Sequence, residues 1–227
     1  MFLILSNPRT GSTWLELMLA ALPDIQADYE IKWQPEYEPN PLVHIVLGRG
    51  GSVAEELTSR GLDGSKLVLD YRQHLTLEYS ALAACIDPRI KLIHLTRDYF
   101  DVVCSVARGC FHKLGKPSDT ELARNLTTLE SDQGLPITLR TPPHALWMND
   151  DWIRSLAQTH EILTLGYTEI PARFEEVARF VGSEATVTEL VKVLSNPPVV
   201  KTPVKRAYAI FSNPGEARRM CNRRTAF

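Results

Sequence analysis

The strongest constraint on the fold is an apolar segment of strand length that runs almost directly into a helix-forming segment. Residues 2–6, FLILS, are continuously apolar, which is typical of a strand buried on both faces of a parallel sheet. Residues 12–22, STWLELMLAAL, are rich in Leu, Met and Ala and stop before Pro23, a pattern that predicts a helix. Residues 7–11 must then form a tight turn, which Gly11 permits.

Three more apolar segments of strand length follow, and each precedes a segment with helical spacing. They are KLVLD at 66–70, IKLIHLT at 90–96 and EILTLGY at 161–167. Strands that alternate with helices pair in parallel through right-handed crossovers. We therefore predict a single α/β domain over residues 1–227, with a doubly wound, mostly parallel sheet flanked by helices. Such sheets bind ligands at the carboxyl ends of their strands.

Composition limits the partners of such a chain. A formal net charge of −2 gives no overall positive field, so we expect no nucleic acid partner, and local groups must hold any anion. The four cysteines lie far apart without a C-x-x-C pair, which favours reduced thiols in the cytoplasm and no metal site. The apolar run at 2–6 is too short for a signal peptide or a transmembrane segment.

The turn SNPRTGSTW has the residue types of an anion-binding site. The amides of residues 10–14 converge from a helix N-terminus, where phosphate or sulfate binds. Ser12 and Thr13 add hydroxyl donors, and Arg9 adds a planar guanidinium. The alternative is a helix start in which Ser12 only caps its own backbone.

An ordinary nucleotide-binding P-loop has the pattern G-x-x-x-x-G-K-[ST], with a Lys after the last Gly and a hydroxyl that holds Mg²⁺. Here Ser12 follows Gly11, and the cation, Arg9, stands two residues before the glycine. The turn therefore favours a phosphate ester whose chemistry needs no bound metal. A P-loop kinase of nucleotides or small molecules is the alternative enzyme class.

A second motif follows the strand at 90–96. In LTRDYFDVVCS, Arg97 and Ser105 are eight residues apart, a little over two helical turns, so both can reach one side of a helix. A second anion-binding pair at a neighbouring strand end suggests a ligand with phosphates at two ends. Taken alone, Arg97 with Asp98 would be read as an ion pair at a helix start, with Ser105 as a buried hydroxyl.

Together these motifs resemble those of the PAPS-dependent sulfotransferases. SNPRTGSTWL is similar to the family's 5′-phosphosulfate loop, LTRDYFDVVCS to its 3′-phosphate motif, and ILTLGYTEI with FEEVARFVG to its late strand, Tyr and helix. The resemblance spans residues 2–182. It implies a P-loop-like α/β fold that transfers a sulfuryl group from 3′-phosphoadenosine 5′-phosphosulfate (PAPS) to a hydroxyl or amine. The product would be adenosine 3′,5′-bisphosphate (PAP).

The resemblance also implies roles for individual residues. Arg9 takes the place of the family's catalytic Lys or Arg, which stabilises negative charge on the bridging oxygen of the leaving phosphate. Trp14 would lie against the adenine or in the core. Lys205 and Arg206 stand for a C-terminal basic loop, although its R-K-G signature is absent. The implied nucleotide-binding residues are Arg9, Thr10, Gly11, Ser12, Thr13, Trp14, Arg97, Ser105, Tyr167, Lys205 and Arg206.

An acceptor that attacks sulfur must lose a proton to a general base. The stretch PDIQADYE resembles the corresponding segment of tyrosylprotein and bacterial carbohydrate sulfotransferases, which implies that Glu30 is the base. Asp70 and His74, in LVLDYRQH, are the alternatives, since the K-T-H sequence of the enzymes for phenols and steroids is absent. The remaining histidines, including His94, are expected to be structural or exposed.

The acceptor is the least defined partner. With a Glu-type base and a short chain, the resemblance favours a small-molecule or carbohydrate acceptor, and a peptide tyrosine is the alternative. A protein that binds PAP without turnover is the third function class. Its discriminating result is tight PAP binding with no sulfuryl transfer to a broad panel of acceptors.

Overall fold

The computed structural model describes residues 1–27, 52–69, 79–102, 104–105 and 143–198, together with 215, 218, 219 and 221. By its backbone contacts, the chain divides into two compact units. The first unit comprises Met1–Thr96 and Asn149–Val200, and the second comprises Arg97–Met148 and Lys201–Phe227.

The described strands of the first unit form one parallel sheet. They are β1 (Phe2–Ser6), β2 (Gly64–Val68), β3 (Lys91–Thr96) and β4 (Ile162–Gly166), in the order β2-β1-β3-β4. In register, Ser6 at the end of β1 pairs with Val68 on one side and Leu95 on the other. The turn after β1 therefore leaves the sheet between the ends of two neighbouring strands. The predicted α/β class with a parallel sheet is confirmed.

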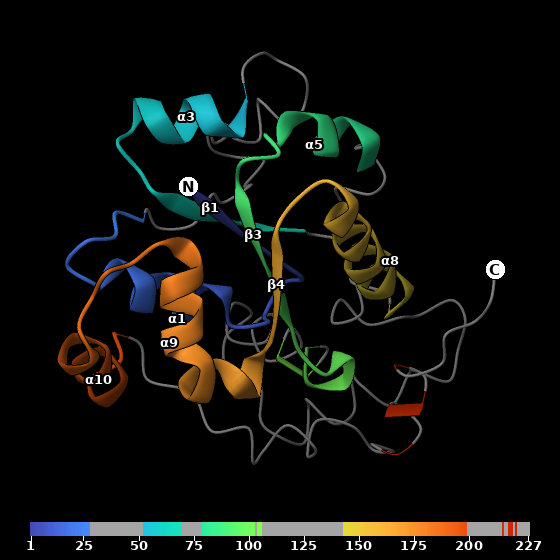
Figure 1. The fold of residues 1–227 in the computed structure, drawn as a ribbon. Helices are drawn as coiled ribbons and strands as arrows, with labels where there is room; N and C mark the ends of the chain where they lie inside the picture. The colour runs from blue at the N-terminus through green and yellow to red at the C-terminus, as the bar shows by residue number, and fades with distance from the viewer. Residues whose placement is uncertain are drawn as a thin grey trace, which may run out of the picture. The chain divides into compact units, whose positions relative to one another are not determined.

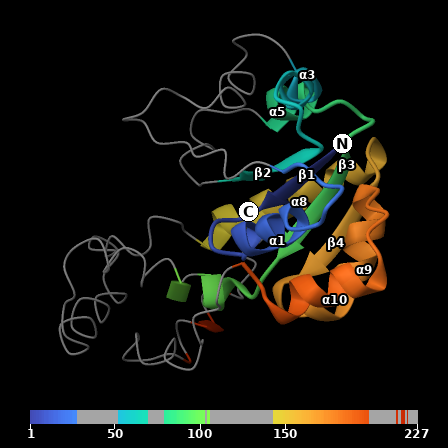
Figure 2. The same ribbon diagram turned by 90° about the vertical axis from the view of Figure 1, so that its left-hand side faces the viewer.

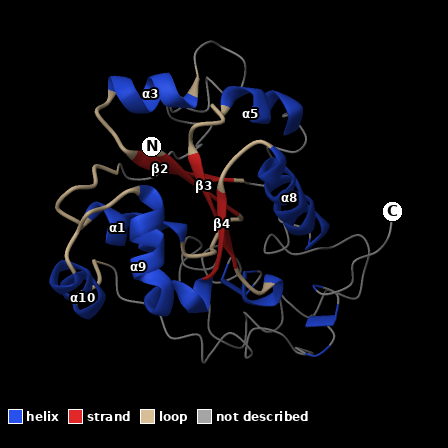
Figure 3. Ribbon diagram, in the orientation of Figure 1, coloured by secondary structure: helices blue, strands red, loops and turns tan. Residues whose placement is uncertain are grey.

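Helices cover both faces of this sheet (Figures 1 and 3), and the strand side chains alternate between them. Phe2 and Ile4 pack into the core cluster of one face, and Leu3 and Leu5 into that of the other. The first face, here the α1 face, carries α1 (Ser12–Ala20), α9 (Ile170–Val181) and α10 (Val187–Ser195). The second, the α8 face, carries α3 (Val53–Ser59), α5 (Tyr79–Cys85) and α8 (Pro143–Ser155). Figure 2 shows the same elements from the side.

The predicted segments match the observed elements to within two residues at each end. β2 begins at Gly64, two residues before the predicted start, and Gly64 pairs with Phe2. A Cβ on Gly64 would lie 2.4 Å from atoms of the Phe2 ring, so only glycine fits there. α9 ends at Val181, and its C-cap Gly182 has a left-handed φ of 94°.

Candidate functional site

The turn between β1 and α1 has two residues in the left-handed region. Gly11 has a φ of 96° and Arg9 a φ of 63°. For a non-glycine residue this conformation costs roughly 1–2 kcal/mol, so the surrounding structure must hold Arg9 in place. Left-handed residues in such a turn let successive amides converge on one point, which forms an anion-binding concavity. The exposed side chain of Arg9 leaves from the same turn.

The first turn of α1 has no side-chain cap. Its N-cap is Gly11 rather than Ser12, and Gly11 O accepts the first helical hydrogen bond from Leu15 N at 3.1 Å. By contrast, α3 and α10 each begin with a capping box, from Ser52 and Thr186 respectively. Because no side chain caps this end of α1, its leading amides and the positive end of its dipole favour an anion there.

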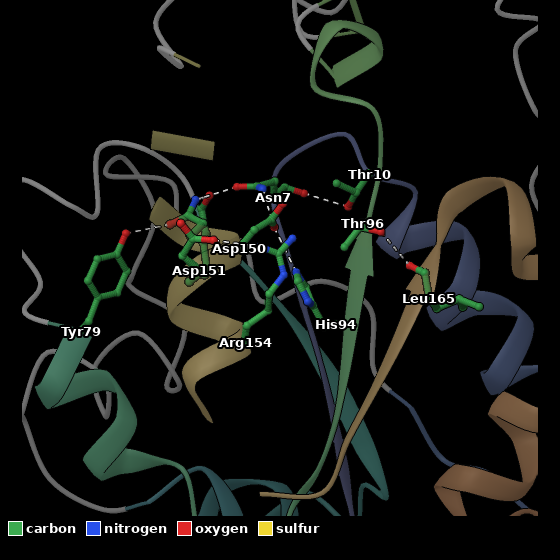
Figure 4. A network of polar contacts seen from close by, with 11 residues as sticks. Asn7, Thr10, Tyr79, His94, Thr96, Asp150, Asp151, Arg154 and Leu165 are labelled. Carbon is green, nitrogen blue, oxygen red and sulfur yellow. Dashed lines mark hydrogen bonds and ion pairs between the residues drawn. The ribbon is translucent and has the colours of Figure 1, made fainter. Parts of the chain in front are cut away.

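On the α8 face, buried polar side chains tie the turn to α8. Asn7 Nδ2 donates to Asp150 Oδ1 at 2.9 Å, and Asn149 Nδ2 donates to Asn7 Oδ1 at 2.7 Å. His94 Nε2 on β3 meets the same Asp150 oxygen at 3.0 Å. The Tyr79 hydroxyl, labelled in Figure 4 together with Asn7, His94 and Asp150, donates to Asn149 Oδ1 at 3.1 Å. We call Asn7, Tyr79, His94, Asn149 and Asp150 the Asn7 network.

This network fixes the start of the turn. Asn7 is buried, and besides its two amide contacts its main-chain oxygen accepts from Thr10 Oγ1 at 2.8 Å. The Thr10 hydroxyl therefore points back into the turn. Burial raises the pKa of Tyr79 from 10.0 to about 12, so its hydroxyl stays a protonated donor into the alkaline range. Among the described residues, His94 Nδ1 has no hydrogen-bond partner, so Nε2 alone anchors this ring through hydrogen bonding.

On the α1 face, a second buried cluster lies under the first turn of α1. Lys66 on β2 pairs in register with Ile4, which belongs to the core of the α1 face. Its Nζ donates to Thr13 Oγ1 at 2.5 Å and lies 3.3 Å from Glu16 Oε2. The side chains of Lys66 and Glu16 are both 0% exposed. We call Thr13, Glu16 and Lys66 the Lys66 cluster.

Tyr167 lies beside the turn, at the start of the 3₁₀ turn η4 (Tyr167–Glu169) after β4. A Cβ on Gly11 would lie 2.5 Å from Tyr167 Cδ2, so the ring excludes any side chain at position 11. Tyr167 also meets Trp14 edge-on, with ring centroids 5.8 Å apart. Trp14 is buried in the core cluster of the α1 face, which is the second of its two predicted placements.

Arg97 and Ser105 lie in the second unit, both half-buried. Residues 99–102, 104 and 105 are helical, and Asp98 Oδ1 accepts from Asp101 N at 3.1 Å at the start of this helix. Arg218, near the end of the chain, pairs with Asp98 at 3.6 Å. The motif therefore has its predicted local form, a strand end followed by a helix.

Comparisons with known proteins identify the fold. No protein-family model and no curated protein matches the chain. The crystal structure of mouse sulfotransferase SULT7A1 complexed with PAP matches with a TM-score of 0.51 at 14% identity, covering 86% of this chain and 63% of that one. A sulfotransferase from Alicyclobacillus acidocaldarius matches with a TM-score of 0.51 at 12% identity, covering 96% and 93%. This chain has the sulfotransferase fold. It spans less than two thirds of the mouse protein's length.

The predicted site residues fall into three groups. The first unit brings together Arg9, Thr10, Gly11, Ser12, Thr13, Trp14 and Tyr167. Arg97 and Ser105 belong to the second unit, so a nucleotide shared with the turn stays a prediction. The remaining predicted residues, Glu30, Asp70, His74, Lys205 and Arg206, lie outside the described residues, and their roles stay predictions.

Sequence reasoning missed the buried polar residues that support the turn of this sulfotransferase fold. Lys66 stands in an apolar strand, and Asn149 and Asp150 stand in the middle of a helix. A charged residue inside a buried strand is an available signal, because Lys is almost never fully buried unless paired. His94 was expected to be structural or exposed, and it is fully buried against Asp150.

The described residues lack two further kinds of feature. These residues contain no group of three or more His, Cys, Asp or Glu side chains that could hold a metal ion. No helix in the described part of the chain has the length and apolar character needed to cross a membrane.

Proposed function

We propose that the chain is a sulfotransferase that moves a sulfuryl group from PAPS to a hydroxyl or amine of a small-molecule or carbohydrate acceptor. The observation that carries the proposal is the uncapped start of α1, with left-handed backbone at Arg9 and Gly11, in a chain with the sulfotransferase fold. PAP in the mouse structure of that fold supports an adenosine bisphosphate as the nucleotide.

The residues of the turn divide the chemistry between them. The amides of residues 10–14 hold the 5′-phosphate, and the positive end of the α1 dipole favours its charge. The Arg9 guanidinium stabilises the negative charge that grows on the bridging oxygen as the bond from sulfur to that oxygen breaks. Tyr167, beside Gly11, is the adenine contact in this proposal.

Residues outside this turn complete the proposal. Arg97 and Ser105 bind the 3′-phosphate, and Lys205 and Arg206 add C-terminal cations. Glu30 takes the proton of the acceptor as the new oxygen–sulfur or nitrogen–sulfur bond forms, with Asp70 and His74 as the alternative bases. No bound metal is assigned a role in this reaction.

The test combines sulfur-labelled PAPS with pooled acceptors, including sugars, phenols and a tyrosine peptide. We expect Arg9→Ala to reduce transfer by about 100-fold to 1,000-fold, the loss typical of one oxyanion donor. The matched control is Arg89→Ala, which removes an arginine that is 84% exposed and pairs with Asp87. We expect Glu30→Gln to retain PAP binding and lose turnover.

Other outcomes would redirect or overturn the proposal. An unchanged rate in Glu30→Gln assigns the base to Asp70 or His74. Tight PAP binding by the wild-type chain without transfer to any acceptor indicates a non-catalytic binding protein. Tighter binding of ATP with Mg²⁺ than of PAP without metal indicates a P-loop kinase.

A further inference from the structure

The Lys66 cluster holds an ammonium group in the hydrophobic core, directly behind the anion-binding turn. The side chains of Lys66 and Glu16 are fully buried, with Nζ 3.3 Å from the carboxylate. Removing two charges from water costs about as much as their attraction returns, so such a pair is weak evidence for stability. The cluster therefore calls for a role other than stabilising the fold.

The geometry at Thr13 indicates that role. A hydroxyl has one proton to donate, whereas an ammonium can only donate. Because Thr13 Oγ1 accepts from Lys66 Nζ at 2.5 Å, the hydroxyl proton must point away from Lys66. No described residue accepts that proton. Thr13 is the second residue of α1 and is partly exposed, next to the amides that converge on the candidate site.

Glu16 completes the arrangement. It stands three residues after Thr13 on α1, so both side chains lie on the same side of the helix. Lys66 reaches both of them from β2. The carboxylate holds the ammonium against the hydroxyl and offsets its charge in the core. What the cluster presents to the turn is thus an oriented, polarised hydroxyl donor, since hydrogen bonds in series strengthen one another.

We propose that Lys66 is a positioning residue for anion binding, which fixes the Thr13 hydroxyl as a donor to the 5′-phosphate in the turn. Glu16 keeps Lys66 in place. The identity of the anion as the 5′-phosphate of PAPS or PAP rests on the proposed function. The orientation of the Thr13 hydroxyl by Lys66 rests only on the described contacts.

The test is a double-mutant cycle read by calorimetric binding of PAP. Lys66→Met alone leaves the Glu16 carboxylate buried without this cation, so it is made together with Glu16→Leu, which restores an apolar core. Thr13→Val removes the hydroxyl with little change of shape. We expect the Glu16→Leu/Lys66→Met variant and the Thr13→Val variant each to weaken PAP binding about tenfold to 100-fold, the range for a hydrogen bond to a charged group.

The decisive result is non-additivity. We expect the triple variant to bind PAP no more weakly than Thr13→Val, because Lys66 acts through that hydroxyl. Adenosine 3′-monophosphate, which lacks the 5′-phosphate, should bind all variants alike. Lys91→Met is the matched control, since Lys91 is a partly buried strand lysine that donates to Phe180 O at the opposite end of the sheet.

Unchanged PAP affinity in a folded Glu16→Leu/Lys66→Met variant would overturn the proposal, as would additive losses in the triple variant. Inorganic pyrophosphate separates this proposal from the proposed function. If the wild-type chain binds pyrophosphate but not PAP, the proposed function fails, and the same cycle is measured with pyrophosphate. Binding of neither by the wild-type chain overturns both.

Discussion

Two buried polar clusters support the same turn from opposite faces of the sheet. They differ at the residue that each places next to the turn, Asn7 in one cluster and Thr13 in the other. In the Asn7 network, the side-chain amide and main-chain oxygen of Asn7 all have partners within the protein. In the Lys66 cluster, the chain of contacts ends at Thr13, whose proton no described residue accepts. The contacts of Asn7 are complete within the protein and hold the turn in place, whereas the Thr13 hydroxyl of the Lys66 cluster is left as the donor that we assign to a ligand.

This difference predicts that changes in the Asn7 network mainly lower the free energy of unfolding, whereas changes in the Lys66 cluster mainly lower the affinity for an anion. A cut in the Asn7 network leaves buried donors or acceptors unpaired and so lowers the free energy of unfolding. Replacement of the whole charged pair in the Lys66 cluster leaves an apolar core and removes only an oriented donor. The first change should appear in denaturation and the second in binding.

The largest expected effect is on stability, from Asp150→Ala. This change removes the acceptor shared by Asn7 Nδ2 and His94 Nε2 in a buried setting, so the free energy of unfolding should fall by about 3 kcal/mol. Urea denaturation measures it. The control is Asp151→Ala, the next residue, whose side chain is 56% exposed and pairs with Arg154; its loss should stay below about 1 kcal/mol. Equal losses in the two variants would contradict the assigned role of the Asn7 network.

Gly11→Ala has the next largest expected effect and should lower both the free energy of unfolding and the affinity for PAP. Gly11 belongs to neither cluster. The new Cβ would meet Tyr167 Cδ2 at 2.5 Å on a backbone with a φ of 96°, so both a clash and strain arise. We expect a loss of at least about 1 kcal/mol in unfolding free energy together with weaker PAP binding.

The control for this change is Gly61→Ala, where φ is 66° and nothing lies within 4 Å of a Cβ. It adds strain without a clash, so its unfolding free energy should fall less and its PAP affinity should not change. If Gly61→Ala weakened PAP binding as much as Gly11→Ala, the loss of binding could not be assigned to the contact between Tyr167 and the turn.

The contrast between the clusters also explains which parts of the site the sequence could predict. The turn was predictable because its signals are local, with an apolar strand, a glycine and a helix within the first residues of the chain. The contact between Lys66 and Thr13 spans 53 positions, and that between Asn7 and Asp150 spans 143. These contacts depend on the sheet order and register, which place Lys66 beside Ile4 and His94 beside Leu5. No periodicity within one segment contains that information.

The predicted general base and the predicted 3′-phosphate motif show what local sequence signals leave out. Glu30 rests on a resemblance in a short segment, and Arg97 rests on a motif whose local form is observed in the second unit. Local secondary structure was predictable in both units, because neighbouring residues determine where a strand ends and a helix begins. A ligand shared by Arg9 and Arg97 requires contacts between segments far apart in the sequence, and PAP binding to Arg9→Ala, Arg97→Ala and the double variant tests it.

The smallest expected effect tests the outer edge of the Asn7 network. Tyr79→Phe removes the hydrogen bond that the Tyr79 hydroxyl donates to Asn149 Oδ1, and should lower the free energy of unfolding by about 1 kcal/mol without changing PAP affinity. The stacking of this ring on Trp152, with centroids 5.2 Å apart, is retained by Phe.

Tyr79 should also make the free energy of unfolding depend on pH in alkaline solution. Burial raises the pKa of Tyr79 from its ordinary value of 10.0 to about 12, so between these values the unfolded chain loses a proton that the folded chain keeps. The stabilising contribution is therefore complete below pH 10 and is lost as the pH rises toward 12. Unfolding free energies measured across this range should fall less steeply in Tyr79→Phe than in the wild-type chain. A parallel pair of curves would show that Tyr79 is equally solvated in both states, and the Asn7 network would then end at Asn149.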